Sequence, residues 1–230
     1  MSIDMEPKTD TVAPPGTPGA PGLRETKKRE TRQLISDHAT RLFIEQGFER
    51  TTIAEIAVAA RVAKKTVTNY FPRKEDLALD HQEAFIGSSA RVVTSREEGE
   101  SALSALRRDF GAAVATQNPV QGFAGPEFSR MIADSPTLSA CLRGMHDQRE
   151  EALAAALAET TGSAPDDITV RTAAALLGAV QRTLFQRVQE LTLTGLTNPE
   201  IAEIVAAEGN RAFGLLEPAL ADYATAGPAS

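Results

Sequence analysis

A short helical pattern in the first third of the chain gathers polar side chains of the kinds that contact nucleic acid. They are Lys64, Lys65, Thr66, Thr68, Asn69 and Tyr70. Lysine attracts phosphate in a salt-dependent way, asparagine pairs with adenine edges, and a threonine methyl suits thymine. Val67 and Phe71 lie four residues apart on the opposite face, where they can fasten the helix to a neighbour. The pattern favours a helix that reads double-stranded DNA over an ordinary surface helix with polar residues.

The preceding residues predict the neighbouring helix. Thr52 is a plausible N-cap, and Glu55 follows it at the spacing of a capping box. The apolar stripe of this helix comprises Ile53, Ile56, Ala57 and Ala60. The second helix starts near Ala63, and Pro72 ends it because proline cannot continue a helix. Two short helices so close together predict a helix-turn-helix.

Charge is distributed unevenly along the chain. Residues 24–76 hold twelve Lys and Arg against eight Asp and Glu, a net charge of +4, whereas the whole chain carries -7 and the remainder therefore -11. A basic head on an acidic body is expected where only the head touches phosphate. Residues 25–46 predict an amphipathic helix that ends at Gly47, and the basic run at 27–32 is either a solvated face or a set of phosphate contacts.

Composition favours an all-α protein with a helix-turn-helix head and a larger helical body. Of the 230 residues, 42% are hydrophobic, dominated by alanine and leucine, and tryptophan is absent. The lone Cys141 excludes an intramolecular disulfide and is more often inert packing than a redox sensor. No catalytic constellation, metal spacing, phosphate-binding glycine loop, membrane span or secretion signal is found. We therefore expect a cytoplasmic protein that is not an enzyme and uses no metal or cofactor.

The order of patterns suggests four segments. Residues 1–23, rich in proline and glycine, predict a disordered tail. The DNA-binding domain spans 24–73, the effector-binding and dimerisation body spans 74–217, and 218–230 form a flexible tail. Within the body we expect helices over 74–94, 101–117, 136–161 and 164–194, a short helix within 120–135, and a last helix after Asn198-Pro199. Ser163 with Asp166 resembles a capping box for the 164–194 helix.

The body offers candidate ligand contacts and a candidate interface. The pocket set comprises Phe123, Phe128, Met131, Met145 and Phe185, with His146, Arg149 or Arg182 as polar discriminators. The alternative for each apolar member is that it simply fills the core. Small residues permit a close approach of helices and favour a homodimer through the last two long helices: Ala173, Ala174, Ala175, Gly178 and Ala179.

Residues 28–77 include LFIEQGFERTT followed by IAEIAVAARVAKKTVTNYFPRKEDL, with a GF turn, a threonine cap and the T.NYF and KEDL segments in that order. In this order and spacing the segment resembles the TetR (tetracycline repressor) family of bacterial regulators. The resemblance implies a homodimer that places two recognition helices on a near-palindromic operator. It also implies a body whose small-molecule effector lowers DNA affinity.

The resemblance assigns roles to single positions. Lys64, Lys65, Thr66, Thr68, Asn69 and Tyr70 form the recognition face, Thr52 caps the second helix, and Lys74 stands where the family contacts a phosphate. Two positions depart from the pattern, because Arg61 replaces the usual turn glycine and Ala63 the usual capping serine. An architectural or protein-responsive DNA-binding regulator without a small-molecule ligand is the alternative function. An all-α enzyme with an accidental basic head is a third reading.

Overall fold

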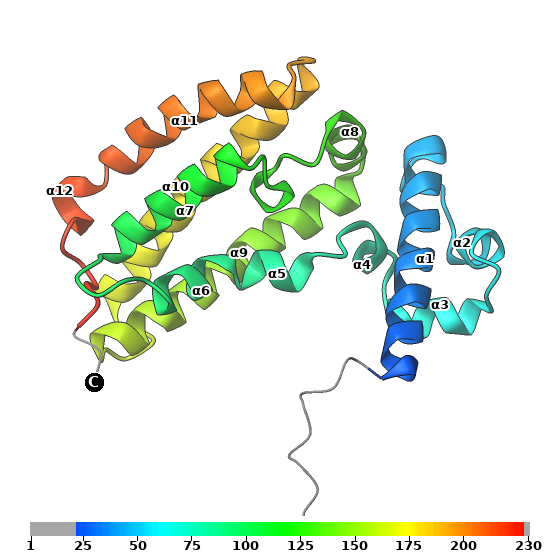
Figure 1. Ribbon diagram of the computed structural model, residues 1–230, viewed down its shortest axis with the longest axis horizontal. Coiled ribbons are helices and arrows are strands. Elements are labelled where there is room, and N and C mark those ends of the chain that lie inside the picture. The colour runs from blue at the N-terminus through cyan, green and yellow to red at the C-terminus, as the bar shows by residue number, and fades with distance from the viewer. Residues whose placement is uncertain (1–21, 228–230) are drawn as a thin grey trace, which may run out of the picture.

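The computed structural model of the protein describes residues 22–227, and this part of the chain contains helices and no strand, so the predicted all-α class is confirmed. The head consists of α1 (Leu23–Gln46), α2 (Ile53–Ala59), α3 (Lys64–Tyr70) and α4 (Lys74–Ala78). Figure 1 shows the head at one end of an elongated molecule, with α1 running across the long direction of the body.

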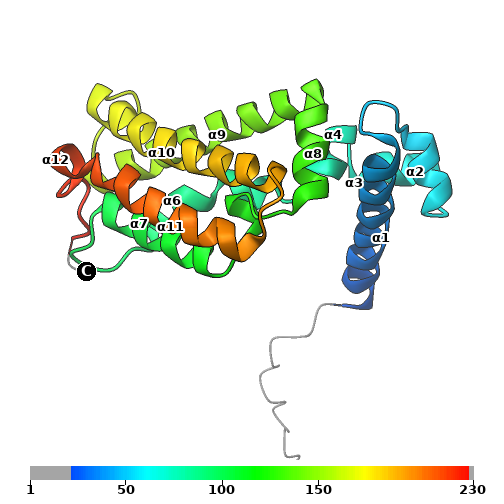
Figure 2. The same cartoon turned by 90° about the horizontal axis from the view of Figure 1, so that it is seen from above.

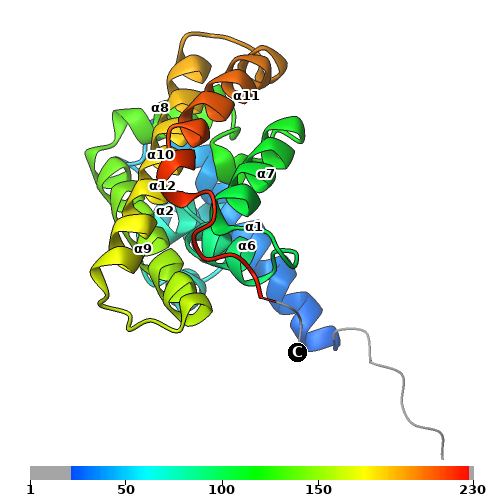
Figure 3. The same ribbon diagram turned by 90° about the vertical axis from the view of Figure 1, so that its left-hand side faces the viewer.

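The body continues with α5 (Gln82–Ile86), α6 (Ser88–Thr94), α7 (Ala102–Ala115), the 3₁₀ turn η1 (Pro119–Gln121), α8 (Pro126–Asp134), α9 (Pro136–Thr161), α10 (Ile168–Leu193), α11 (Asn198–Gly214) and α12 (Glu217–Leu220). Helix α9 packs on α6 and α10, α10 packs on α11, and α11 packs on α7. Figures 2 and 3 show these helices from above and from the far end of the body, where they form one bundle. Helix α9 matches the predicted 136–161 helix.

The head forms as the residue pattern predicts. Helix α1 buries Ile35, Ala39 and Phe43, which recur every four residues, and ends at Gly47, whose φ of 85° suits glycine. At the start of α2, the Glu55 amide donates to Thr52 Oγ1 at 3.3 Å and the Thr52 amide donates to Glu55 Oε2 at 2.7 Å. The predicted capping box is therefore confirmed.

The predicted single helix over 74–94 is wrong, because α4, α5 and α6 are separate pieces. Leu79 leaves the helical region with ψ of 49°, yet its side chain stays buried. The next residue, Asp80, forms an ion pair with Arg32 of α1. These two long-range interactions hold residues 79–81 away from helical geometry. The connection between head and body is therefore jointed, which here means three short helices linked by non-helical residues.

Two predicted helix starts in the body are also wrong. Ser163 does not cap α10, because that helix begins only at Ile168. The Ser163 amide instead donates to the Ala158 carbonyl and completes the end of α9 together with Gly162, whose φ is 65°. Asp167 caps α10 instead and accepts from the amides of Thr169 and Val170 at 2.8 and 3.2 Å. At α11 the capping position belongs to Thr197, and the Asn198-Pro199 pair forms the first two helical residues.

The C-terminal segment from residue 218, whose flexibility stays a prediction, packs against the body in its described part. Leu220 and Ala224 are buried, and the Ala226 amide donates to the Glu100 carbonyl at 3.1 Å. Arg96 Nη2 also donates to the Ala224 carbonyl at 2.7 Å. The described end of the chain is thus fastened to the α6–α7 connection. The predicted disordered tail at 1–23 lies almost wholly outside the described residues, as do the last three residues.

The apolar interior forms two clusters. The larger belongs to the body and includes Leu106, Leu157, Leu177 and Phe213. The other cluster contains the head core, with Phe43 and Phe71, and extends to Leu138, Met145 and Phe185 of α9 and α10. Apolar packing therefore crosses the expected boundary at residue 73, which stays a prediction. Over the described residues, no helix is long and apolar enough to cross a membrane.

Candidate nucleic-acid interface and ligand cavity

The recognition helix α3 presents its polar residues outward. Lys64, Lys65, Thr68 and Asn69 are exposed, and Thr66 and Tyr70 are half-buried. On the other side, Val67 and Phe71 are almost fully buried in the head cluster. The spacing of these two apolar residues holds the helix against α2, as the pattern predicts. Thr52 is exposed at the start of α2. The structure therefore places all the predicted DNA-facing residues of α2 and α3 at the surface of the head.

The turn between α2 and α3 has two unusual residues, which are the two departures from the family pattern. Arg61 has φ of 54°, the left-handed conformation that a glycine adopts without strain. Ala63 precedes α3 in extended geometry and supplies no side-chain cap. The turn therefore keeps the geometry that the family pattern implies, but without the residues that suit it best.

Arg32 has a structural role that the sequence does not reveal. Its Nη1 donates to the Tyr70 carbonyl at 3.1 Å, its guanidinium lies 4.2 Å from the centre of the Phe71 ring, and it forms the ion pair with Asp80. The side chain thus joins α1, the end of α3 and the break after α4. In the same basic run, Lys27, Lys28 and Arg29 are exposed, so they remain free to face phosphate.

Lys74 is engaged within the head rather than directed at solvent. Its Nζ donates to the carbonyls of Phe48, Thr51 and Glu49 at 2.9, 3.2 and 3.4 Å, and lies 4.3 Å from the centre of the Phe48 ring. An ammonium group has three N–H donors. These bonds would have to be exchanged before Nζ could contact a phosphate. The structure therefore gives Lys74 the role of fastening α4 to the turn at residues 47–51.

An apolar cavity of about 400 Å³ lies where head and body meet. Four predicted residues line it: Phe123, Phe128, Met145 and Phe185. Sequence reasoning missed the walls that come from α1 and from the α4–α5 segment, which include Ser36, Thr40, Leu77, Leu79 and Phe85. Leu77, Leu79 and Phe85 are apolar residues of the expected 74–94 helix, but no local signal tells a cavity wall from solid core.

The other predicted ligand residues lie elsewhere, so the eight do not form one pocket. Met131 lines a separate cleft, and His146 and Arg182 line a smaller cavity of about 180 Å³. Arg182 forms ion pairs with Asp147 and Glu150 at 2.8 and 3.8 Å. Arg149 is buried inside the body and lines none of these spaces. The set is distributed over several spaces because residues on one helix face can lie on different sides of a packed neighbour, and its role in ligand binding stays a prediction.

His146 and Cys141 are held in their uncharged forms. Burial lowers the pKa of His146 to about 4, and the positive charges of Arg149 and Arg182 act in the same direction. Burial also raises the pKa of the Cys141 thiol, which disfavours the reactive thiolate. His146 is therefore neutral at physiological pH, and Cys141 fits the packing interpretation. The described residues hold no cluster of three or more His, Cys, Asp or Glu placed to bind a metal.

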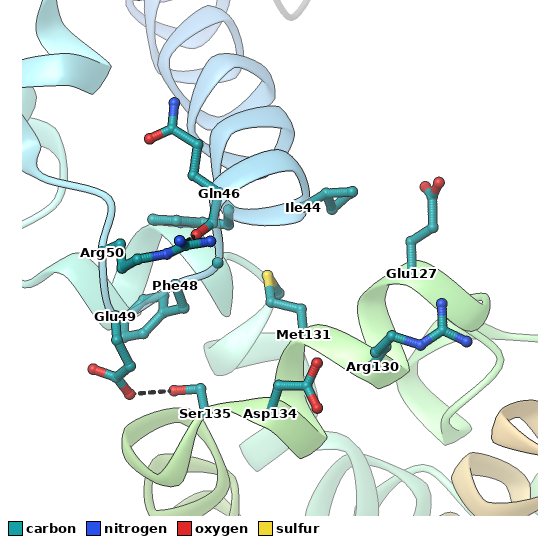
Figure 4. A pocket seen from close by; sticks show the side chains of 12 residues that line it. Ile44, Gln46, Phe48, Glu49, Arg50, Glu127, Arg130, Met131, Asp134 and Ser135 are labelled. Carbon is teal, nitrogen blue, oxygen red and sulfur yellow. Dashed lines mark hydrogen bonds between the residues drawn. The ribbon is translucent and has the colours of Figure 1, made fainter.

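Figure 4 shows the separate cleft between the end of α1 and α8. It measures about 440 Å³ and is lined largely by charged side chains: Glu49, Arg50, Glu127, Arg130 and Asp134. At one end, Ser135 Oγ donates to Glu49 Oε1 at 2.6 Å, and the same Ser135 oxygen accepts the Leu138 amide at 3.1 Å. The hydrogen bond from Ser135, with one from Thr137, holds the pKa of Glu49 below its usual value. The cleft thus ends in a direct polar contact between head and body.

Known proteins share both parts of this architecture. Residues 35–80 match the family model for bacterial regulatory proteins of the tetR family, and residues 100–207 match that for the MftR C-terminal domain. The HTH-type transcriptional regulator TcmR of Streptomyces glaucescens is 32% identical over 181 residues, which span 76% of this chain and 80% of TcmR.

Two solved structures show the same fold at low sequence identity. A TetR-family transcriptional regulator from Syntrophomonas wolfei superposes with a TM-score of 0.53 at 21% identity, covering 81% of this chain and 96% of that one. The SmeT–triclosan complex gives a TM-score of 0.55 at 17% identity, covering 87% and 96%.

A helix-turn-helix head with an exposed lysine, threonine and asparagine face, carried by a helical body, defines a DNA-binding transcriptional regulator. The identity to TcmR extends this class to most of the chain. The protein belongs to the tetR family of bacterial regulatory proteins.

Proposed function

We propose that the protein is a repressor that holds a near-palindromic operator as a homodimer and releases it when a small molecule occupies the apolar cavity. The observation that carries this proposal is the position of the cavity, whose walls include α1 and the α4–α5 segment as well as α9 and α10. A ligand there touches the helices that set the head and the helices that form the body. SmeT, which shares the fold, has been solved with triclosan.

Release requires that the ligand prefer one arrangement of head and body over the other. The jointed connection supports such a preference, because α4, α5 and α6 meet at short non-helical links. Leu77 and Leu79 of this segment line the cavity, while Asp80 holds Arg32 of the head. A molecule that displaces Leu79 therefore acts one residue away from the ion pair that fixes α1 and the end of α3.

For the operator, the recognition face comprises Lys64, Lys65, Thr66, Thr68, Asn69 and Tyr70, with Thr52 beside it. We assign base contacts to Asn69 and the threonines, and phosphate contacts to the two lysines, because these side chains suit such partners. Exposed Lys27, Lys28 and Arg29 at the start of α1 extend the basic surface. A regulator of this kind acts on chromosomal DNA in the cytoplasm.

The dimer interface is proposed on the outer face of α10 with α11. An exposed stripe of small and apolar residues runs along α10 at helical spacing: Ile168, Thr172, Ala175, Leu176 and Ala179. On α11, Ala206 and Ala207 are also exposed. Two copies joined through these faces form a four-helix interface. Of the small residues expected there, Ala173 and Ala174 are instead buried within their own chain.

The effector proposal is tested with an operator selected from a random duplex library by the full-length protein. Binding of the labelled operator is followed by fluorescence anisotropy while triclosan and a panel of neutral and acidic aromatic compounds are titrated. We expect a selected site with two symmetric halves and release by at least one compound. Ala124→Phe, which projects a ring into the cavity, should abolish release, and Ala112→Phe on the exposed face of α7 should not.

Two outcomes would contradict the proposal. An operator without two-fold symmetry would exclude the paired-head arrangement, and release that Ala124→Phe leaves unchanged would exclude the cavity. If no compound releases the operator, the alternative of a regulator without a small-molecule ligand is favoured. The dimer is tested by sedimentation of Leu176→Glu, which we expect to be monomeric, against Ala112→Glu, which we expect to stay dimeric.

A further inference from the structure

Arg149, in the middle of α9, is a charged side chain buried in the body. Only 3% of the residue is exposed. Its Nε donates to Ser89 Oγ at 2.7 Å, but Nη1 and Nη2 have no hydrogen-bond partner among the described residues. Burial lowers the pKa of Arg149 to about 10, which still leaves the guanidinium protonated at neutral pH. Four N–H donors of a buried cation are therefore unused.

The surroundings of Arg149 fix its orientation without satisfying those donors. Ser89 Oγ, which accepts from Nε, donates to Gln181 Oε1 at 2.8 Å, so α6, α9 and α10 are joined through one polar chain. Asp109 of α7 supplies the nearby negative charge, but it makes no hydrogen bond with either terminal nitrogen. Burial raises the pKa of Asp109 itself. The hydrogen bond from Nε thus holds the guanidinium in place, while the terminal fork formed by Nη1 and Nη2 has no acceptor among the described residues.

Phe85 contacts both this guanidinium and the apolar cavity. The Arg149 guanidinium carbon lies 5.0 Å from the centre of the Phe85 ring, and Phe85 also lines the cavity. The ring packs edge-on against His146 and Phe185, with centroids 5.0 and 5.7 Å away. His146 Nε2 is likewise buried and has no hydrogen-bond partner within residues 22–227. A single aromatic ring therefore borders both the cavity and the guanidinium that carries the unused donors.

We propose that the effector is an organic anion, with an aromatic or otherwise apolar body and a carboxylate or similar group that pairs with Arg149. The apolar body occupies the cavity, the anionic group displaces the Phe85 ring, and its two oxygens accept from Nη1 and Nη2. This inference rests on the proposed function, because it names the class of molecule that the cavity accepts.

The chemistry favours an anion over a neutral ligand. A buried guanidinium whose terminal donors lack acceptors is costly, and its full compensation requires both opposite charge and hydrogen-bond acceptors. A carboxylate provides two acceptor oxygens at the spacing of the guanidinium fork, which a hydroxyl or an amide carbonyl does not. The apolar lining of the cavity by Phe123, Phe128, Met145 and Phe185 supplies the remaining binding surface. Asp37 and Asp80 also line the cavity and repel an anion, so the anionic group is placed at Arg149 and away from them. A cavity of about 400 Å³ is large enough for a two-ring molecule.

The same step accounts for coupling to the head. Phe85 belongs to α5, the five-residue helix between the break at 79–81 and Gly87. Displacement of its ring acts on the jointed connection that carries α4. Recognition of the anion and movement of the head are thus linked through one side chain.

The test uses full-length protein and two matched pairs of probes: naphthalene-2-carboxylic acid with its carboxamide, and biphenyl-4-carboxylic acid with its carboxamide. Calorimetric titration at pH 7 gives the affinity of each. We expect at least one acid to bind the wild-type protein tenfold or more tightly than its amide. Arg149→Met should weaken the acid at least tenfold and change the amide less than twofold. Arg143→Met, which removes an exposed charge from the same helix, should leave the preference intact.

Two further variants keep the result interpretable. If Arg149→Met does not fold, Arg149→Lys keeps the charge but loses the fork, and the acid preference should fall severalfold. Asp109→Asn removes the only nearby competitor that the structure places beside Arg149 among the described residues, and should raise acid affinity rather than lower it.

The outcomes separate this inference from the proposed function. Equal binding of acid and amide, or an acid preference that survives in Arg149→Met, overturns the anion inference. If the amides bind as tightly as the acids and still release the operator, the cavity keeps its proposed role and only the inference that the effector is an anion is refuted. If no member of either pair binds and no compound releases the operator, both proposals are wrong.

Discussion

Replacement of Lys74 by methionine separates two roles that the same position can have. In the first, Nζ contacts a phosphate, as the resemblance implies. In the second, Nζ fastens α4 to the turn at residues 47–51, as its bonds to the carbonyls of Phe48, Glu49 and Thr51 indicate. Methionine keeps the length and apolar stem of the side chain and removes only the ammonium group. The structure supports the second role.

The expected loss of stability follows from the contacts. Three hydrogen bonds from one half-buried ammonium, whose acceptors can partly turn to water, contribute about 1–2 kcal/mol, below the value for fully buried charged donors. The contact with the Phe48 ring adds about 0.5 kcal/mol at this exposure. A total of about 2 kcal/mol corresponds to a melting temperature lower by about 4–8 °C for a domain of this size.

The assay pairs thermal unfolding with operator affinity over a range of salt concentrations. Lys65→Met is the control, because Lys65 is exposed on the recognition helix. We expect the control to lose about one unit of salt slope per phosphate contact, with a stability change below about 0.5 kcal/mol. Lys74→Met should instead lose about 2 kcal/mol of stability and keep the wild-type salt slope. If it instead keeps the wild-type melting temperature and loses salt slope as the control does, the assignment of Lys74 to the turn is refuted.

Three further predictions concern the turn and a buried histidine. Ala63→Ser supplies the missing N-cap of α3 and should raise the free energy of unfolding by about 1 kcal/mol in urea denaturation. Arg61→Gly relieves the left-handed backbone and should stabilise by up to about 1 kcal/mol in the same assay, whereas Arg61→Ala should not. The pKa of His146 falls from 6.5 to about 4 on folding, so its contribution to stability is complete above pH 6.5 and is lost as the pH falls to 4. Over that range the wild type should lose about 3 kcal/mol more than His146→Gln in denaturation at each pH.

Local patterns were sufficient to predict the head. The capping box of Thr52 and Glu55, the pairing of Val67 with Phe71, and the end of α1 at Gly47 all depend on residues within a few positions of one another. Helical spacing and caps act at that range, so a single sequence contains them.

The interpretations that failed depend on partners far along the chain. The break after α4 follows from the ion pair between Asp80 and Arg32, 48 positions apart. Ser163 looked like a cap, but α10 begins only at Ile168 after Asp167, and the Ser163 amide instead completes the end of α9. The eight pocket candidates are distributed over different spaces because the packing of α8, α9 and α10 directs their side chains to different sides.

The hydrogen bond between Glu49 and Ser135 has a consequence for protein engineering. Heads of related regulators are natural modules to exchange when an operator specificity is to be joined to a new sensor. Here the acceptor, Glu49, belongs to the head, and the donor, Ser135, caps the start of α9 in the body. A junction placed at residue 73 therefore takes the two partners of this hydrogen bond from different proteins. A chimera that receives this head on another body therefore needs a hydroxyl at the position equivalent to Ser135. Without that hydroxyl, the chimera can bind its operator, but its DNA affinity can fail to respond to the effector.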